Sequence, residues 1–268
     1  MRAARWVALA VFRESVRDKI FYNLVLFAVL LVGASLLIGQ LTAGQDVKII
    51  KDLGLAATSL FGLFVAIFVG INLVSKEIDR RSIYPLLAKP LRRSEFIVGK
   101  YFGLLLTLAV NIVVMTVAIY AVLLYMSYGV PAKLQAAWDT PALSPSLLLA
   151  IGLIYVELAV VTAVALFFST YSSPVLSAIF TLGVYVIGQF STDLKQLNTI
   201  VDSTAAIWLA KACYYILPDF SRFDVKLQVV HGLPVTGAFV AGSVAYGVAY
   251  IAALVFGAVV LFSRRDFK

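Results

Sequence analysis

The chain has 268 residues, of which 62% are apolar or aromatic and only 13% are charged. Soluble domains are about half apolar and about 25% charged, so this composition excludes a soluble enzyme and predicts an integral membrane protein. The net charge of +8 then indicates basic residues held at one face of a membrane, and we expect no nucleic-acid partner. The single cysteine, Cys213, excludes an intrachain disulfide, and the single histidine, His231, excludes a multi-histidine metal site.

Residues 1–20 form the first predicted element, a basic amphipathic helix lying in the cytoplasmic interface. Its apolar residues at helical spacing are Trp6, Leu9, Phe12, Val16 and Ile20. A cleavable signal peptide is the competing interpretation. It fails because the apolar run that follows is too long for a signal sequence and lacks a small-residue cleavage site.

Six apolar stretches follow, and a helix needs about 20 apolar residues to cross about 30 Å of hydrocarbon. The predicted spans cover residues 21–41, 53–74, 101–126, 147–168, 175–190 and 235–262. The fourth and fifth spans share an uncharged run from Leu158 to Thr192. We divide this run at the polar segment 169–174, which ends in a proline, because a single helix would be too long for one crossing.

Segment 191–234 is predicted to lie outside the cytoplasm. Within it, residues 205–217 are apolar but too short to cross, so we expect a re-entrant or interfacial helix there. With the N-terminus inside, fifteen of the 22 Lys and Arg residues lie in the cytoplasm. This bias predicts one all-α membrane domain over residues 1–268, with six spans and both termini in the cytoplasm.

Residues 76–100 form the only sizeable cytoplasmic loop of this layout. The loop alternates charged clusters with apolar residues, namely Ile83, Leu86, Leu87, Leu91 and Phe96. It could therefore offer a soluble partner both apolar and charged contacts. The alternative is an amphipathic loop that rests on anionic lipid headgroups.

The same loop resembles the cytoplasmic loop of type 2 ABC-transporter permeases, the ABC-2 family. The residues that carry the resemblance are Glu77, Arg81, Ser82, Ile83, Leu86, Leu87, Pro90, Arg93, Phe96, Gly99 and Lys100. The chain departs from the family at Arg81-Ser82, where a small residue and Thr are usual. The order of the predicted elements over most of the chain is also similar to that of these permeases.

A second resemblance lies before the last span. Pro218, Asp219, Phe223 and Asp224 are similar to a Pro-Asn/Asp-x-x-x-Phe-Asp pattern in permeases of the nitrous-oxide-reductase maturation and gliding subgroup. This resemblance implies a surface that touches substrate or an extracytoplasmic partner. A simple ordered turn is the alternative interpretation.

The family resemblance implies an exporter permease in a bacterial or archaeal inner membrane, paired with a second permease copy or close homologue. Two copies of a separate ATPase would bind the 76–100 loop. The coupling residues that it implies are Glu77, Arg80, Arg81, Leu86, Leu87, Pro90 and Arg93. The chain has no Gly-x-x-x-x-Gly-Lys-Ser/Thr motif, so we expect neither enzymatic activity nor a cofactor on this chain, with ATP and Mg on the partner.

Glu157 is the one charged residue inside a predicted span. An acid there is costly and marks either a structural polar network or a proton or substrate pathway. The expected structural partners are Thr107, Asn111, Thr116 and Thr162. The pathway interpretation leads to an alternative function, a proton-coupled secondary transporter. A third alternative is a non-transporting membrane anchor for an extracytoplasmic assembly.

Overall fold

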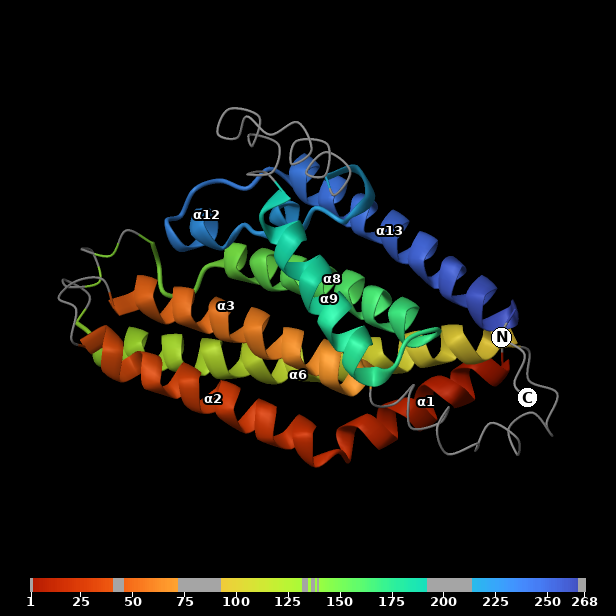
Figure 1. Ribbon diagram of the computed structural model, residues 1–268. Coiled ribbons are helices and arrows are strands. Elements are labelled where there is room, and N and C mark those ends of the chain that lie inside the picture. Colours follow the sequence, from red (N-terminus) through yellow and green to blue (C-terminus); the bar gives the residue numbers. More distant parts are fainter. Residues whose placement is uncertain are drawn as a thin grey trace.

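The computed structural model describes residues 2–40, 46–71, 93–131, 135, 138, 140–191 and 214–264. Every regular element in these ranges is a helix, which confirms the all-α class. In chain order the helices are α1 (Arg2–Val16), α2 (Lys19–Gln40), α3 (Asp46–Phe64), η1 (Val65–Val69), α6 (Arg93–Gly129), α8 (Pro145–Ser169), α9 (Pro174–Gln189), η3 (Phe220–Phe223), α12 (Lys226–Val230) and α13 (Gly237–Arg264) (Figure 1).

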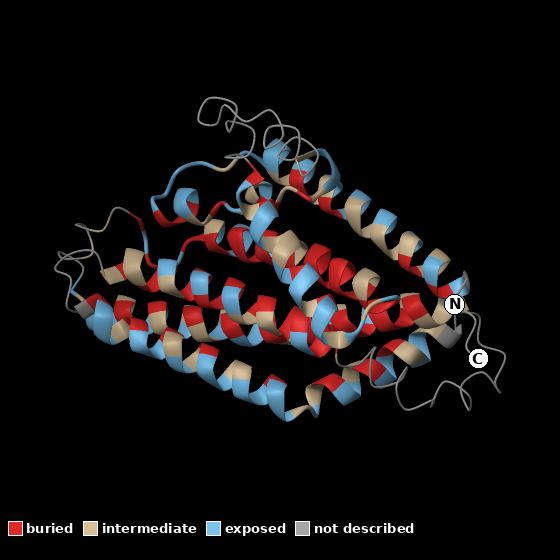
Figure 2. Cartoon of the chain, viewed as in Figure 1, coloured by how far each residue is buried: buried red, intermediate tan, exposed pale blue. Residues whose placement is uncertain are grey.

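Helices α3, α6 and α8 form the centre of the bundle. They contact one another, while α2 lies on α3 and α6, and α13 lies on α8 and α6. In α8, 72% of the most apolar 18-residue stretch is buried, against 22% in α2 and 11% in α13. Figure 2 shows the exposed residues on the outward faces of these flanking helices. Apolar outward faces of this kind fit a hydrocarbon environment.

Five described helices are long and apolar enough to cross a membrane: α2, α3 with η1, α6, α8 and α13. Helix α9 occupies the predicted fifth span but has only 16 residues, a rise of about 24 Å. It begins at Pro174, just after the turn that follows Ser169, where the polar segment divides the uncharged run. Proline suits the first turn of a helix, because the amide hydrogen that it lacks would be unpaired there anyway.

The second crossing helix begins earlier than the sequence predicts. The predicted span starts at residue 53, whereas α3 starts at Asp46. The reason is that Val47, Ile50 and Lys51 continue the buried face of the helix beyond the charged Asp52. A prediction that starts the span after the last charged residue therefore places the start of the helix too late, because the charged Lys51 is itself fully buried in the helix.

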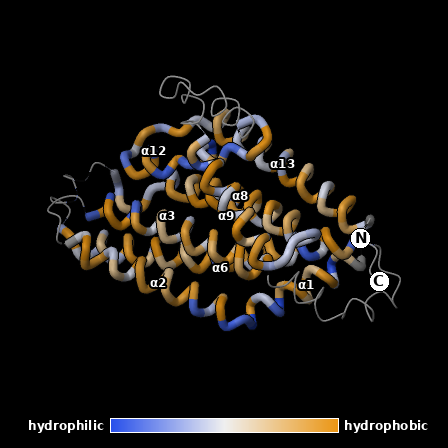
Figure 3. The backbone as a smooth tube through the Cα atoms, in the orientation of Figure 1, coloured by the Kyte–Doolittle hydropathy of each residue, from blue (hydrophilic) through white to orange (hydrophobic). Residues whose placement is uncertain are grey.

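Helix α1 is amphipathic, but the face that packs differs from the predicted stripe. Ala8, Val11 and Ser15 are buried against the bundle, whereas Trp6 is 73% exposed and Leu9 is also exposed. The buried face carries small residues because α1 lies along the start of α6, where two glycines allow close approach. Hydrophilic residues gather where α1 meets α2 (Figure 3).

Candidate functional site

Three clusters contain the described residues that the sequence singles out, and the first is the start of α6. Arg93 Nη1 donates a hydrogen bond to the Ser263 carbonyl oxygen at 2.8 Å. The Phe96 ring stacks on Phe262 with 5.8 Å between centroids, and Lys100 Nζ lies 4.6 Å from the Phe96 centroid. The end of the predicted coupling loop is therefore fixed to the end of α13. The other predicted coupling residues lie outside the described residues: Glu77, Arg80, Arg81, Leu86, Leu87 and Pro90.

The start of α6 also packs tightly against α1. A Cβ atom at Gly103 would lie 2.7 Å from both the Ala8 carbonyl oxygen and the Val11 Cβ. A Cβ at Gly99 would lie 2.7 Å from the Val7 Cβ. Since a backbone carbonyl cannot rotate away, glycine is required at this seam. Gly99 belongs to the loop motif. Only its spacing to Gly103 could have predicted from the sequence that it packs against α1.

The second cluster surrounds Glu157, which is fully buried at the centre of α8. Its Oε1 accepts a hydrogen bond from Gln189 Nε2 at 3.0 Å, and Gln189 Nε2 also donates to the Tyr185 hydroxyl at 3.1 Å. Glu157 Oε2 has no hydrogen-bond partner within the described ranges. The cluster thus joins α8 and α9 around one acid.

The partners expected for Glu157 were wrong. The hydroxyls of Thr107, Thr116 and Thr162 donate to carbonyl oxygens four residues earlier in their own helices. The amide of Asn111 is buried with no partner in the described part of the chain. A threonine in a helix can donate its hydroxyl hydrogen bond to a carbonyl oxygen of the same helix, so it needs no partner on another helix. The turn between α8 and α9, in contrast, brings Gln189 opposite Glu157. The position of that turn was the available signal.

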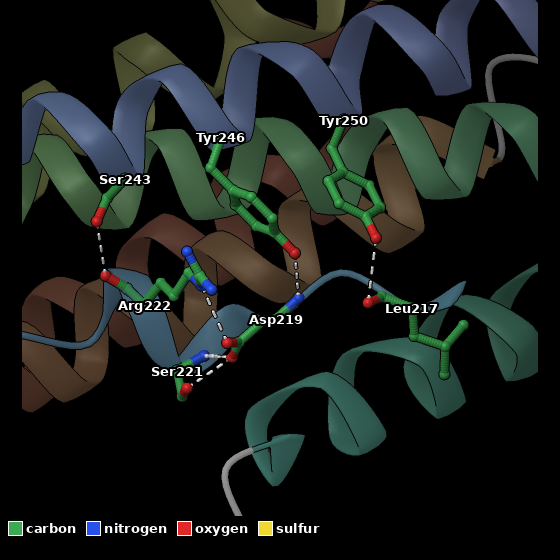
Figure 4. A network of polar contacts seen from close by, with 7 residues as sticks. All are labelled: Leu217, Asp219, Ser221, Arg222, Ser243, Tyr246 and Tyr250. Atoms are coloured by element: carbon green, nitrogen blue, oxygen red, sulfur yellow. Dashed lines mark hydrogen bonds and ion pairs between the residues drawn. The ribbon is translucent and has the colours of Figure 1, made fainter. Parts of the chain in front are cut away.

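The third cluster is residues 217–224, which we name the clasp (Figure 4). Asp219 accepts hydrogen bonds from the Ser221 amide at 3.2 Å and the Ser221 hydroxyl at 2.6 Å, and so caps η3. Arg222 Nε lies 3.2 Å from Asp219 Oδ2, and its guanidinium lies 4.9 Å from the Tyr246 ring centroid. The ordered turn is thus held by its own polar side chains.

Hydroxyl groups of α13 hold the backbone of the clasp. The Asp219 amide donates to the Tyr246 hydroxyl at 2.8 Å, Ser243 donates to the Arg222 carbonyl at 3.1 Å, and Tyr250 donates to the Leu217 carbonyl at 3.3 Å (Figure 4). Three irregular backbone groups are thereby paired, as a buried or membrane-embedded segment requires.

Apolar side chains hold the inner side of the clasp. Pro218, Phe220 and Phe223 are buried, and the Phe220 ring lies 5.5 Å from that of Tyr185. Of the four motif residues, Pro218 and Phe223 therefore pack inward. Asp219 caps η3, and the exposed Asp224 accepts a hydrogen bond from the Lys226 amide at 3.2 Å.

Lys51 is a buried cation that sequence reasoning missed. Its Nζ donates to Thr140 Oγ1 at 3.0 Å, the Pro141 carbonyl at 2.8 Å and Ser144 Oγ at 3.4 Å. These three acceptors use all the donors of an ammonium group and tie α3 to the segment that precedes α8. The signal was the helical spacing of Val47, Lys51 and Gly54. No group of three or more metal-binding His, Cys, Asp or Glu side chains occurs among the described residues.

Comparison with known proteins identifies one family. Residues 5–267 match the sequence profile described as ABC-2 family transporter protein. The match covers nearly the whole chain, including all three clusters. No curated protein matches the sequence.

Proposed function

Because the chain belongs to the ABC-2 family of transporter membrane proteins, and so is a multi-pass membrane component of an ABC transporter, we propose that it is an exporter permease driven by a separate ATPase. Family membership implies the ATPase partner. In the proposed assembly two ATPase copies dock on the 76–100 loops of two permease subunits, either identical or closely related. The 218–224 motif supports the nitrous-oxide-reductase maturation and gliding subgroup, and the half-transporter layout supports a prokaryotic inner membrane.

The observation that carries the proposal is the charge difference between the two ends of the bundle. We name the end where α1 and α6 begin and α13 finishes the basic end (Figure 1). The described residues of α1, its junction with α2, the first turns of α6 and the last turn of α13 include eight Lys or Arg and three Asp or Glu, a net charge of +5. At the opposite end, the start of α3 has two of each, namely Lys48, Lys51, Asp46 and Asp52. The positive-inside tendency favours a cytoplasmic basic end, where a soluble ATPase has access.

The course of the chain supports six spans despite the short α9. Helix α6 leaves the basic end and α8 returns to it. Since α13 also finishes at the basic end, beside Arg93, the chain must leave that end once more between α8 and α13. Helix α9 begins this passage, and Gln189 at its end reaches the level of Glu157.

Purification of the tagged chain in mild detergent, followed by mass spectrometry, tests the proposed docking site. Leu86→Asp/Leu87→Asp places two charges in the loop. The matched control is Leu227→Asp/Leu233→Asp, because these leucines are 70% and 54% exposed and lie towards the opposite end. We expect an ATPase to copurify with the unmodified chain and the control but not with the loop variant. An ATPase that stays bound to the loop variant would contradict docking on this loop.

One observation favours the second candidate function, a proton-coupled carrier. Glu157 is fully buried, and its Oε2 lacks a partner among the described residues. That function requires the carboxyl group itself and makes the loop dispensable. If no ATPase copurifies with the unmodified chain and Glu157→Gln abolishes the growth phenotype that the gene supports, the carrier replaces the ABC permease.

A further inference from the structure

The clasp lies at the depth of the middle of the bundle. Glu157 is twelve residues from each end of α8, a distance of about 18 Å. A Cβ atom at Gly247 would lie 2.7 Å from the side chain of Val156 and 3.3 Å from the ring of Phe223. The neighbour of Glu157 in α8 therefore meets α13 and the clasp at one level. If α8 crosses the membrane, this level is well inside the hydrocarbon thickness of about 30 Å.

Contacts with α9 place the clasp at the same depth. Gly188 is in close contact with the Pro218 carbonyl oxygen and with the Phe220 ring. Gln189, the next residue, reaches Glu157. The contacts of α8 and those of α9, which begin at opposite ends of the bundle, thus place the clasp at the same depth.

The clasp nevertheless carries exposed charges. The Arg222 side chain is 51% exposed, and Asp224 is exposed as well. Lys226, the first residue of α12, follows two positions after Asp224. Charged side chains facing lipid at this depth would cost several kcal/mol, so charged residues inside membranes normally face water or protein.

We propose that the clasp forms one wall of a water-filled vestibule, which opens to the extracytoplasmic side and reaches the depth of Glu157. Arg222 and Asp224 face its water, and both signs of charge on the wall suit the polar part of an exported molecule. This inference rests on the orientation given under the proposed function. An open cavity of about 220 Å³ lies beside the clasp, towards the start of α13. Its lining residues are Val225, Gln228, Pro234, Val235, Thr236 and Phe239.

Thiol labelling tests the vestibule directly. Arg222→Cys and Asp224→Cys are each made in a Cys213→Ser background and treated with a charged, membrane-impermeant methanethiosulfonate reagent. The matched control is Val248→Cys, because Val248 is 57% exposed and follows Gly247 at the same depth. Labelling is measured in intact cells and in inverted membrane vesicles.

We expect Arg222→Cys and Asp224→Cys to react in intact cells at least about tenfold faster than Val248→Cys, because lipid excludes a charged reagent from the control. Unreactive clasp cysteines would overturn the vestibule, since water would not reach them. Fast reaction of Val248→Cys would also overturn it, because the whole level would then lie outside the membrane. Reaction of the clasp cysteines only in inverted vesicles would support the vestibule and overturn the proposed orientation instead. None of these results depends on the ATPase.

Discussion

Gly103 is the position where the packing of α1 on α6 can be tested most sharply. In Gly103→Ala the new Cβ would lie 2.7 Å from the Ala8 carbonyl oxygen and from the Val11 Cβ, so α1 must move away. Overpacking of this kind costs about 1–3 kcal/mol, of which the better helix propensity of Ala recovers about 0.5–1 kcal/mol. The net cost is about 0.5–2 kcal/mol, and with about 2–4 °C per kcal/mol for a domain of this size the melting temperature should fall by about 1–8 °C.

The assay is thermal unfolding of the purified permease in detergent. Gly152→Ala in α8 is the matched control, because a Cβ there meets nothing within 4 Å. We expect the control to melt at or slightly above the temperature of the unmodified chain. If Gly103→Ala and Gly152→Ala melt together, α1 does not lie against the start of α6 as described.

Three further substitutions test the other clusters. Lys51→Met should destabilise the protein by about 1–3 kcal/mol, because it leaves the Pro141 carbonyl without a donor; an unchanged melting temperature would refute the role of this cation. Tyr246→Phe removes the hydroxyl that accepts the hydrogen bond of the Asp219 amide, and the loss should cost about 0.6–1.7 kcal/mol. We expect faster amide hydrogen exchange in residues 217–224, and unchanged exchange would contradict the role of this hydrogen bond in holding the clasp. Glu157→Gln keeps the shape of the side chain, so ATP turnover of the purified complex should stay within about twofold of the unmodified level; a complete loss would instead assign the carboxyl group to transport.

The fold class could be predicted from features of residues that lie close together in the chain. Long uncharged runs predict helices, and the five helices long and apolar enough to cross coincide with such runs. The structure turns between Ser169 and Pro174 because a polar segment and a proline stop one helix and start the next. These features depend only on residues close together in the chain.

Contacts between helices were less predictable. The stripe of α1 was misjudged because Trp6 and Leu9 have the larger apolar side chains, whereas the seam selects small residues that fit against Gly99 and Gly103. Likewise, the partner of Glu157 depends on which helix the following turn brings back, not on which polar residues are available. Hydrophobicity predicts that a helix is embedded, but steric fit decides which face packs.

Native mass spectrometry of the complex released from its own membrane is the most direct test of the central claim, that this chain is the membrane half of an ATP-driven transporter. We expect a single complex whose mass equals that of two permease subunits plus two ATPase subunits. A permease that leaves the membrane without an ATP-binding subunit, under conditions that preserve its own dimer, would contradict the account.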